Sequence, residues 1–237
     1  MNKKSDQNEY SLYEILDLAR DGSSQEIQRI VSFNNSLIHI QDENGTTLLM
    51  EASMHGNFNL VKFLVEVGAD ANQIDVMGIC PLFYAAQAKC WDIFEYLFDL
   101  TNQDLKEVSV SISAIDGELK VLEALIDKQV SVDAYREKGV WSKNGFTALI
   151  STVQEGLVEV VKILLHAGAD PNLAEEDTGG TPLMYAAKHG YLEILHLLLE
   201  AGADPTLRDY SNETALMKAE KFNKNSIIEV LLDARSQ

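Results

Sequence analysis

Residues 179–205 read GGTPLMYAAKHGYLEILHLLLEAGADP, and this stretch decides the fold. Thr181 can accept a backbone N–H as the N-cap of a helix, and Pro182 suits the first helical position. Gly190 interrupts the pattern, and apolar residues at helical spacing then follow. Gly202 is placed to end that second helix in a left-handed conformation. The stretch therefore predicts two short helices joined by a tight turn.

The same pattern recurs along most of the chain. It reads NGTTLLMEASMHGNFNLVKFLVEVGADAN over residues 44–72 and NGFTALISTVQEGLVEVVKILLHAGADPN over residues 144–172. The capping position is occupied in turn by Thr47, Cys80, Thr147, Thr181 and Thr214, at intervals of 33, 67, 34 and 33 residues. The double interval holds a degenerate copy over residues 108–130. A period near 33 residues indicates helix pairs that bury their apolar faces by stacking on one another.

The motifs T-P-L-x-x-A-A, a central Gly, an apolar second helix and G-A-D-x-N carry a family resemblance. The chain resembles ankyrin-repeat proteins over about residues 10–235. That resemblance implies an all-α solenoid of about seven helix–turn–helix units with β-turn fingers. The His of the family's T-P-L-H motif is replaced by Met50, Phe83, Ile150, Met184 and Met217. We therefore expect apolar packing where the family has a hydrogen bond between repeats.

We expect residues 1–237 to form a single ankyrin-repeat domain. Residues 10–41 read as an N-terminal cap pair, residues 42–208 as five repeats with the fourth degenerate, and residues 209–237 as a C-terminal cap repeat. The finger that follows Thr101 is expected to be short. The finger at 130–146 is expected to be about six residues longer than the others.

The charge balance limits the partners. Acidic residues number 37 and basic residues 19, which gives a net charge of −18 and repels nucleic-acid phosphates and anionic membranes. The excess favours a basic protein partner, or it only keeps an exposed solenoid in solution. No apolar leader and no stretch of about 18 apolar residues are present. We expect a cytoplasmic monomer that binds neither nucleic acid nor membrane directly.

Catalytic and metal motifs are absent from the sequence. No Walker loop, G-x-S-x-G or H-E-x-x-H pattern occurs, and the five His and two Cys residues lack ligand spacing. We predict no enzyme, no metal and no cofactor. The alternative is an enzyme whose site is hidden within the stack, which assays for turnover would detect.

The family resemblance implies that a partner binds the finger tips and the exposed face of each first helix. The matching residues, with neighbouring aromatic groups, are Glu43, Asn44, Met54, His55, Val76, Met77, Ile79, Tyr84, Gln87, Tyr135, Trp141, Lys143, Asn144, Phe146, Glu155, Tyr185, Lys188, His189 and Tyr210. Trp141 and Tyr135 near basic residues are typical of an interface anchor. In the competing interpretation the long finger covers the weak fourth repeat, and the other finger residues pack only on adjacent fingers.

These observations predict a protein–protein interaction module that acts as an adaptor or inhibitor. The alternative is an acidic inhibitor or immunity-type protein that neutralises a basic toxin, effector or nucleic-acid-binding protein. A third hypothesis is an acidic mimic of nucleic acid, which would compete with DNA for a DNA-binding partner. Fold alone does not name the partner.

Overall fold

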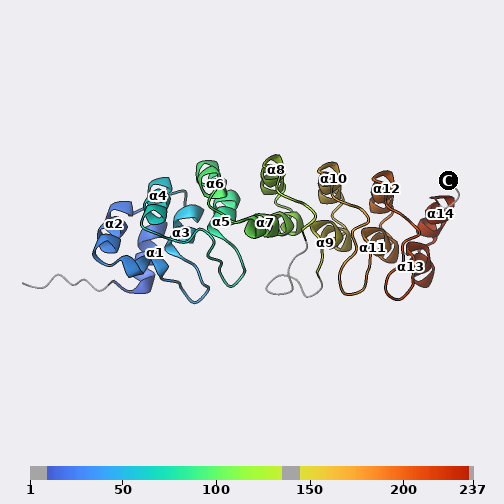
Figure 1. The fold of residues 1–237 in the computed structure, drawn as a ribbon, viewed down its shortest axis with the longest axis horizontal. Helices are drawn as coiled ribbons and strands as arrows, with labels where there is room; N and C mark the ends of the chain where they lie inside the picture. The colour runs from blue at the N-terminus through green and yellow to red at the C-terminus, as the bar shows by residue number, and fades with distance from the viewer. Residues whose placement is uncertain (1–9, 135–144, 235–237) are drawn as a thin grey trace, which may run out of the picture. The chain divides into compact units, whose positions relative to one another are not determined.

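The computed structural model describes residues 10–134 and 145–234 of the chain (Figure 1). These residues form 14 α-helices, arranged along the chain as seven pairs, and one 3₁₀ helix. The described residues contain no strand, and a single antiparallel bridge joins Gln41 to Thr47 at the base of a finger. The all-α architecture of helix pairs and fingers is thus confirmed. The chain divides into two compact units, residues 1–105 and 106–237.

The first unit holds three helix pairs in two layers. The first helices α1, α3 and α5 contact one another in sequence, and α2, α4 and α6 form the second layer (Figure 1). The elements are α1 (Leu12–Arg20), α2 (Ser24–Phe33), the 3₁₀ helix η1 (Asn35–His39), α3 (Leu48–Met54), α4 (Phe58–Glu66), α5 (Pro81–Gln87) and α6 (Trp91–Phe98).

The second unit repeats the same arrangement. First helices α9, α11 and α13 contact one another in order, and α10, α12 and α14 form the second layer. The elements are α7 (Gln103–Asp116, which begins in the first unit), α8 (Leu119–Asp127), α9 (Ala148–Glu155), α10 (Val158–His166), α11 (Pro182–His189), α12 (Leu192–Glu200), α13 (Ala215–Lys221) and α14 (Asn225–Ala234).

The predicted helix caps form at most of the first helices. Each capping Thr side chain accepts the backbone N–H of the residue three positions on, which satisfies one of the free donors of the first turn. This holds for Thr47, Thr147, Thr181 and Thr214. Cys80 makes no such bond, and Pro81 begins that helix instead.

Apolar residues fill the position of the family's His in four copies. Met50, Phe83, Ile150 and Met184 are each at most 1% exposed, which confirms the expected apolar packing there. Met217 of the last repeat is 42% exposed, so the expectation is wrong at that position. Thr47 also donates its backbone N–H to the Met50 sulfur at 3.4 Å, which keeps a weak polar contact.

The turn between paired helices requires a left-handed residue. Gly156 has φ +73°, and a Cβ built there would lie 3.0 Å from the Tyr191 ring. Lys89 occupies the same position two repeats earlier, in the first unit, with φ +60°. A left-handed backbone costs a residue with a Cβ about 1–2 kcal/mol, so Lys89 carries strain that a glycine would not.

The degenerate copy departs from the expected short finger. Its first helix, α7, begins at Gln103, only two residues after Thr101, so this repeat has no finger at all. Asn102 caps the helix by accepting the backbone N–H of Leu105 at 2.9 Å, and the Thr101 hydroxyl donates to the Leu97 carbonyl. The chain turns directly from α6 into a helix of 14 residues because capping groups follow α6 at once.

Candidate functional site

The fingers of the first unit are built around one carboxylate each. Asp42 accepts the backbone N–H groups of Asn44 and Thr46 at 2.9 and 2.8 Å. Asp75 accepts those of the residues two and four positions on, both at 2.8 Å. Two backbone bonds to one side chain fix the path of each turn, so the residues at the tip have a defined position.

The two fingers also bind each other through the main chain. Val76 donates its N–H to the Asn44 carbonyl at 2.8 Å. Gly45 allows this approach, because its φ is +79° and a Cβ there would lie 3.1 Å from the Asp75 Cα atom. Val76 and Met77 remain 58% and 54% exposed at the tip. Apolar side chains are therefore displayed on a backbone that is held in place.

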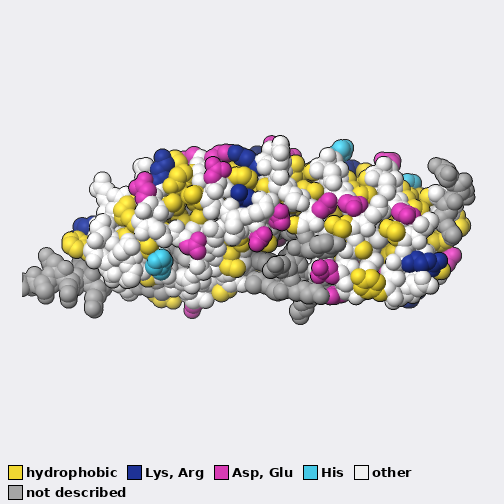
Figure 2. All heavy atoms as spheres, viewed as in Figure 1, with side chains coloured by type: hydrophobic (Ala, Val, Ile, Leu, Met, Phe, Trp, Pro, Cys, Tyr) yellow, Lys and Arg dark blue, Asp and Glu magenta, His cyan; other side chains and the backbone are white. Residues whose placement is uncertain are grey.

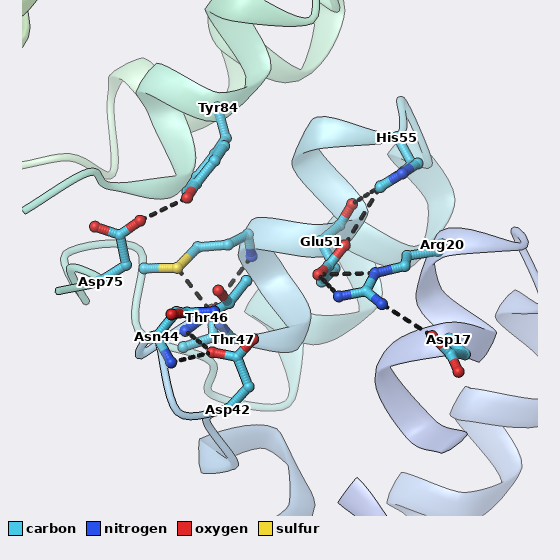
Figure 3. Close-up of polar contacts among 11 residues, drawn as sticks. Asp17, Arg20, Asp42, Asn44, Thr46, Thr47, Glu51, His55, Asp75 and Tyr84 are labelled. Carbon is cyan, nitrogen blue, oxygen red and sulfur yellow. Dashed lines mark hydrogen bonds and ion pairs between the residues drawn. The ribbon is translucent and has the colours of Figure 1, made fainter. Parts of the chain in front are cut away.

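The fourth residue after each cap connects the first helix to its finger. The Tyr84 hydroxyl donates to Asp75 at 2.5 Å (Figure 3). Burial, followed by this carboxylate, raises the pKa of Tyr84 well above its ordinary value. The phenol therefore stays protonated and keeps the hydrogen bond at physiological pH.

Glu51 holds the same position one repeat earlier but cannot donate to Asp42. Its side chain, 2% exposed, turns instead to Arg20 of α1, whose Nε and Nη2 donate to Oε1 at 3.0 and 2.7 Å (Figure 3). His55 Nδ1 lies 3.5 Å from Oε2. Asp17 holds the Arg20 guanidinium from its exposed side at 2.9 Å. An ion pair between a buried carboxylate and a partly exposed guanidinium thus joins α1 to α3.

The predicted residues of the first unit occupy two neighbouring fingers and the two first helices, α3 and α5, that follow them. Glu43 and Asn44 are exposed on one finger, Val76 and Met77 on the next, and Ile79 is half-buried. Met54, His55 and Gln87 are exposed at the C-terminal ends of α3 and α5. Tyr84 is half-buried, and its hydroxyl is engaged within the chain.

The second unit uses a longer carboxylate where its finger gains a residue. Glu175, 1% exposed, takes the position of the finger aspartate, and it precedes the capping Thr by six positions rather than five. Its Oε1 accepts the hydroxyl groups of Tyr185, at 2.9 Å, and Thr178. Burial, then Glu175, raises the pKa of Tyr185 to about 12. Oε2 has no hydrogen-bond partner among the described atoms.

The last finger uses an ion pair in place of the phenol. Lys218 contacts Asp209 at 2.6 Å, and Asp209 also accepts two backbone N–H groups of its own finger. Tyr210 donates its N–H to the Thr178 carbonyl at 2.8 Å and lies over Gly179 with 73% of its side chain exposed. Adjacent fingers therefore pair here as they do in the first unit.

The other predicted residues of the second unit gather near α9 and α11. Phe146 is half-buried and meets the Tyr185 ring edge-on, with centroids 6.1 Å apart. Glu155 and His189 are exposed, and Lys188 is half-buried. The predicted residues Tyr135, Trp141, Lys143 and Asn144 lie outside the described residues.

Sequence reasoning missed the residues that hold the fingers. Asp75, Glu175 and Asp209 are buried, and neither they nor Arg20 stood out as isolated residues. A usable signal was present, because an acid precedes the capping residue by five or six positions in four of the copies. The recurring position of the acid before the cap would have identified these residues, whereas the residue type alone would not, because the chain has many acids.

The described residues contain neither a group of potential metal ligands nor a helix suited to cross a membrane. No three His, Cys, Asp or Glu side chains in residues 10–134 and 145–234 come together in a way that could hold a metal ion. Within the same ranges, no helix combines the length and the apolar character needed to cross a membrane.

The fold and the finger surfaces define a helix-pair repeat protein. Comparison with known families identifies the type of repeat. The family model described as "Ankyrin repeats (3 copies)" matches residues 15–109 and 173–237, and the one described as "Ankyrin repeats (many copies)" matches residues 146–199. The chain belongs to the ankyrin-repeat family.

Solved structures support the same fold. The ankyrin repeat domain of Bcl-3, described as a member of the IkappaB family, superposes with a TM-score of 0.75 at 21% identity, over 92% of this chain and 97% of that one. The human ASB11 ankyrin repeat domain gives a TM-score of 0.65 at 25% identity, over 93% and 96% of the two chains.

The similar proteins match this chain over only part of their own length or of its length. The chain is 30% identical over 139 residues to an ankyrin repeat and KH domain-containing protein of Caenorhabditis elegans, and 26% identical over 168 residues to the nuclear factor NF-kappa-B p105 subunit of Gallus gallus. It is 34% identical over 95 residues to the human protein phosphatase 1 regulatory subunit 27. These matches span 56%, 66% and 38% of this chain but only 5%, 17% and 62% of the relatives. The similarity supports a protein-interaction module.

Proposed function

We propose that this chain acts as an adaptor or inhibitor that binds a partner protein through the finger and first-helix surface of its first unit. The display of Val76 and Met77, each more than half exposed, on a finger fixed by Asp75 carries this proposal. Ordering a loop costs about 1–2 kcal/mol per residue, and a turn held by its own carboxylate has already met much of that cost before binding.

The partner is proposed to present an apolar side chain among basic residues. Glu43 is exposed, and the next residue, Asn44, accepts the N–H of Val76. An acidic side chain is therefore close to the apolar finger tip. The net charge of −18 adds a long-range attraction for such a partner. The proposal includes binding without catalysis, in line with the regulatory subunit among the relatives.

Site-specific photocrosslinking in cells of the source organism tests this proposal. A photoreactive phenylalanine derivative at Met77 is expected to give a covalent adduct with one protein. The same group at Glu66, exposed on α4 in the second layer, is the matched control and is expected to give none. Adducts at both positions, or at neither, would refute the assigned surface.

The captured protein then provides a quantitative check. Met77→Ser is expected to weaken its binding about tenfold, because removing a buried methionine costs about 1.5–3 kcal/mol. The free protein should keep its stability, since Met77 is 54% exposed. Unchanged affinity for the captured protein would count against the proposal.

A further inference from the structure

The C-terminal end of the second unit concentrates positive charge in an otherwise acidic chain. Figure 2 shows Lys or Arg side chains over α13, next to apolar groups. The basic–aromatic surface consists of Lys188, His189, Met217, Phe222 and Lys224, from α11, α13 and the turns that follow them. It shares no residue with the surface assigned above to the first unit.

The two lysines of this surface have no acidic partner. Among the described residues, no carboxylate lies within 4.0 Å of Lys188 or Lys224. One nearby acid, Glu213, is already engaged, because it contacts both Lys218, at 3.1 Å, and Lys221, at 2.8 Å. The positive charge of Lys188 and Lys224 is therefore available to an external group.

The two ammonium groups also lie close to one imidazole. The Lys224 stem passes over Gly190, since a Cβ there would lie 2.9 Å from its Cδ atom. Burial, then Lys188 and Lys224, lowers the pKa of His189, against an opposing effect of Glu155. His189 stacks on Tyr191 with the ring centroids 5.5 Å apart. The positive charges of Lys188 and Lys224 are thus both near His189, and Glu155 is the carboxylate that acts on the same imidazole.

Exposed apolar groups border the lysines. Phe222 and Met217 are 43% and 42% exposed, and the Lys188 ammonium lies 5.9 Å from the Phe222 ring centroid. An aromatic ring beside unpaired cations offers both an apolar contact and a charge contact within one area. A ligand that fits it must carry negative charge and an apolar group together.

We propose that the basic–aromatic surface binds an acidic segment of a partner protein, whose carboxylates meet Lys188 and Lys224 and whose apolar side chain covers Phe222. This extends the proposed interaction function to a second surface. A nucleic acid fits less well, because its continuous phosphate charge is repelled by the net charge of −18. A short acidic segment carries few charges and supplies the apolar side chain that a phosphate backbone lacks.

The test uses a short fluorescein-labelled peptide of Glu and Leu residues and the full chain. Binding is followed by fluorescence anisotropy at low salt. Lys188→Gln combined with Lys224→Gln is expected to weaken binding about tenfold, as two surface ion pairs are lost. The control combines Lys62→Gln and Lys120→Gln, which are exposed lysines elsewhere and remove the same charge. It should change binding less than about twofold.

Further probes identify what the surface recognises. A peptide with Gln in place of Glu, and the variant Phe222→Ser, are both expected to bind more weakly. Circular dichroism should show that the lysine variants remain folded, because both side chains are partly exposed and neither has an acidic partner among the described residues.

Three outcomes would overturn the inference. They are no binding of the acidic peptide, an equal loss in the control, and tighter binding of a single-stranded oligonucleotide through Lys188 and Lys224. The photocrosslinking at Met77 uses another unit and another ligand. Failure of either experiment therefore leaves the other result standing.

Discussion

Replacing Arg20 by Met tests whether the buried Glu51 carboxylate depends on its guanidinium. The substitution keeps an apolar stem of similar length but removes two hydrogen bonds to Oε1, at 3.0 and 2.7 Å. Glu51, with 2% of its side chain exposed, would keep only the His55 ring, whose Nδ1 lies 3.5 Å from Oε2. An uncompensated buried charge is one of the most destabilising changes a protein can undergo.

The size of the effect follows from the burial of both partners. Breaking a fully buried pair costs about 3–5 kcal/mol. The Arg20 side chain is 43% exposed, so solvent screens part of its attraction to Glu51. We therefore expect Arg20→Met to lower the free energy of unfolding by about 2–3 kcal/mol.

A second substitution distinguishes the energetic effect of the Arg20–Glu51 ion pair from that of side-chain packing. Glu51→Met in the Arg20→Met background replaces the ion pair by two apolar side chains, and most of the lost stability should return. Urea unfolding followed by far-UV circular dichroism measures all four members of the cycle, with the slope of each transition checked for equality. The reasoning fails if Arg20→Met costs nothing, or if the double variant is less stable than Arg20→Met.

Three further changes probe the turns and the last finger. Lys89→Gly should raise the free energy of unfolding by about 1 kcal/mol by relieving the left-handed strain, and a loss measured by urea unfolding would contradict this. Gly156→Ala should destabilise more than Gly168→Ala in a thermal melt, since both have positive φ but only the first meets a neighbouring ring; equal losses would argue against that contact. Lys218→Met should cost about 1–2 kcal/mol at pH 7. Burial raises the pKa of Asp209, but Lys218 outweighs burial and the pKa is lowered, so the pair stabilises the fold above the ordinary pKa of Asp. The difference in unfolding free energy between the wild type and Lys218→Met should therefore narrow below about pH 4. A difference that stays constant with pH would show that the stability of the pair is not linked to the protonation of Asp209.

Most of the fold could be predicted because its signals are local and repeated. Thr181, Pro182 and Gly190 each have a preference set by their own backbone chemistry, and the 33-residue period shows that these preferences recur in phase. The degenerate copy was located over residues 108–130, but the start of its first helix at Gln103 was missed because its finger is absent. The sequence contains no repeat motif at this point to indicate that Asn102 caps a helix beginning at Gln103. The single domain over residues 1–237 stays a prediction.

The candidate site was less accessible from the sequence, since it depends on which way side chains turn. Exposure of Val76 and Met77 follows from their place on a finger and was predicted. The roles of Tyr84 and Tyr185 were not, because both were assigned to partner contact and both hydroxyls bind finger acids. Periodicity shows that these phenols lie near the surface, but only the coordinates show their partners.

The position four residues after each cap explains how the fingers can differ and still keep one geometry. It holds Glu51, Tyr84, Tyr185 and Lys218 in four of the repeats. A phenol or an ammonium donates to the acid of its own finger, whereas the Glu at this position cannot and is bound by Arg20 instead. Because these contacts fix the base of the fingers that hold Asp75, Glu175 and Asp209, substitutions at the exposed tips of those fingers change what is displayed without changing where it is displayed. Partner specificity should therefore follow the tip residues, while changes at the fourth position should alter stability first.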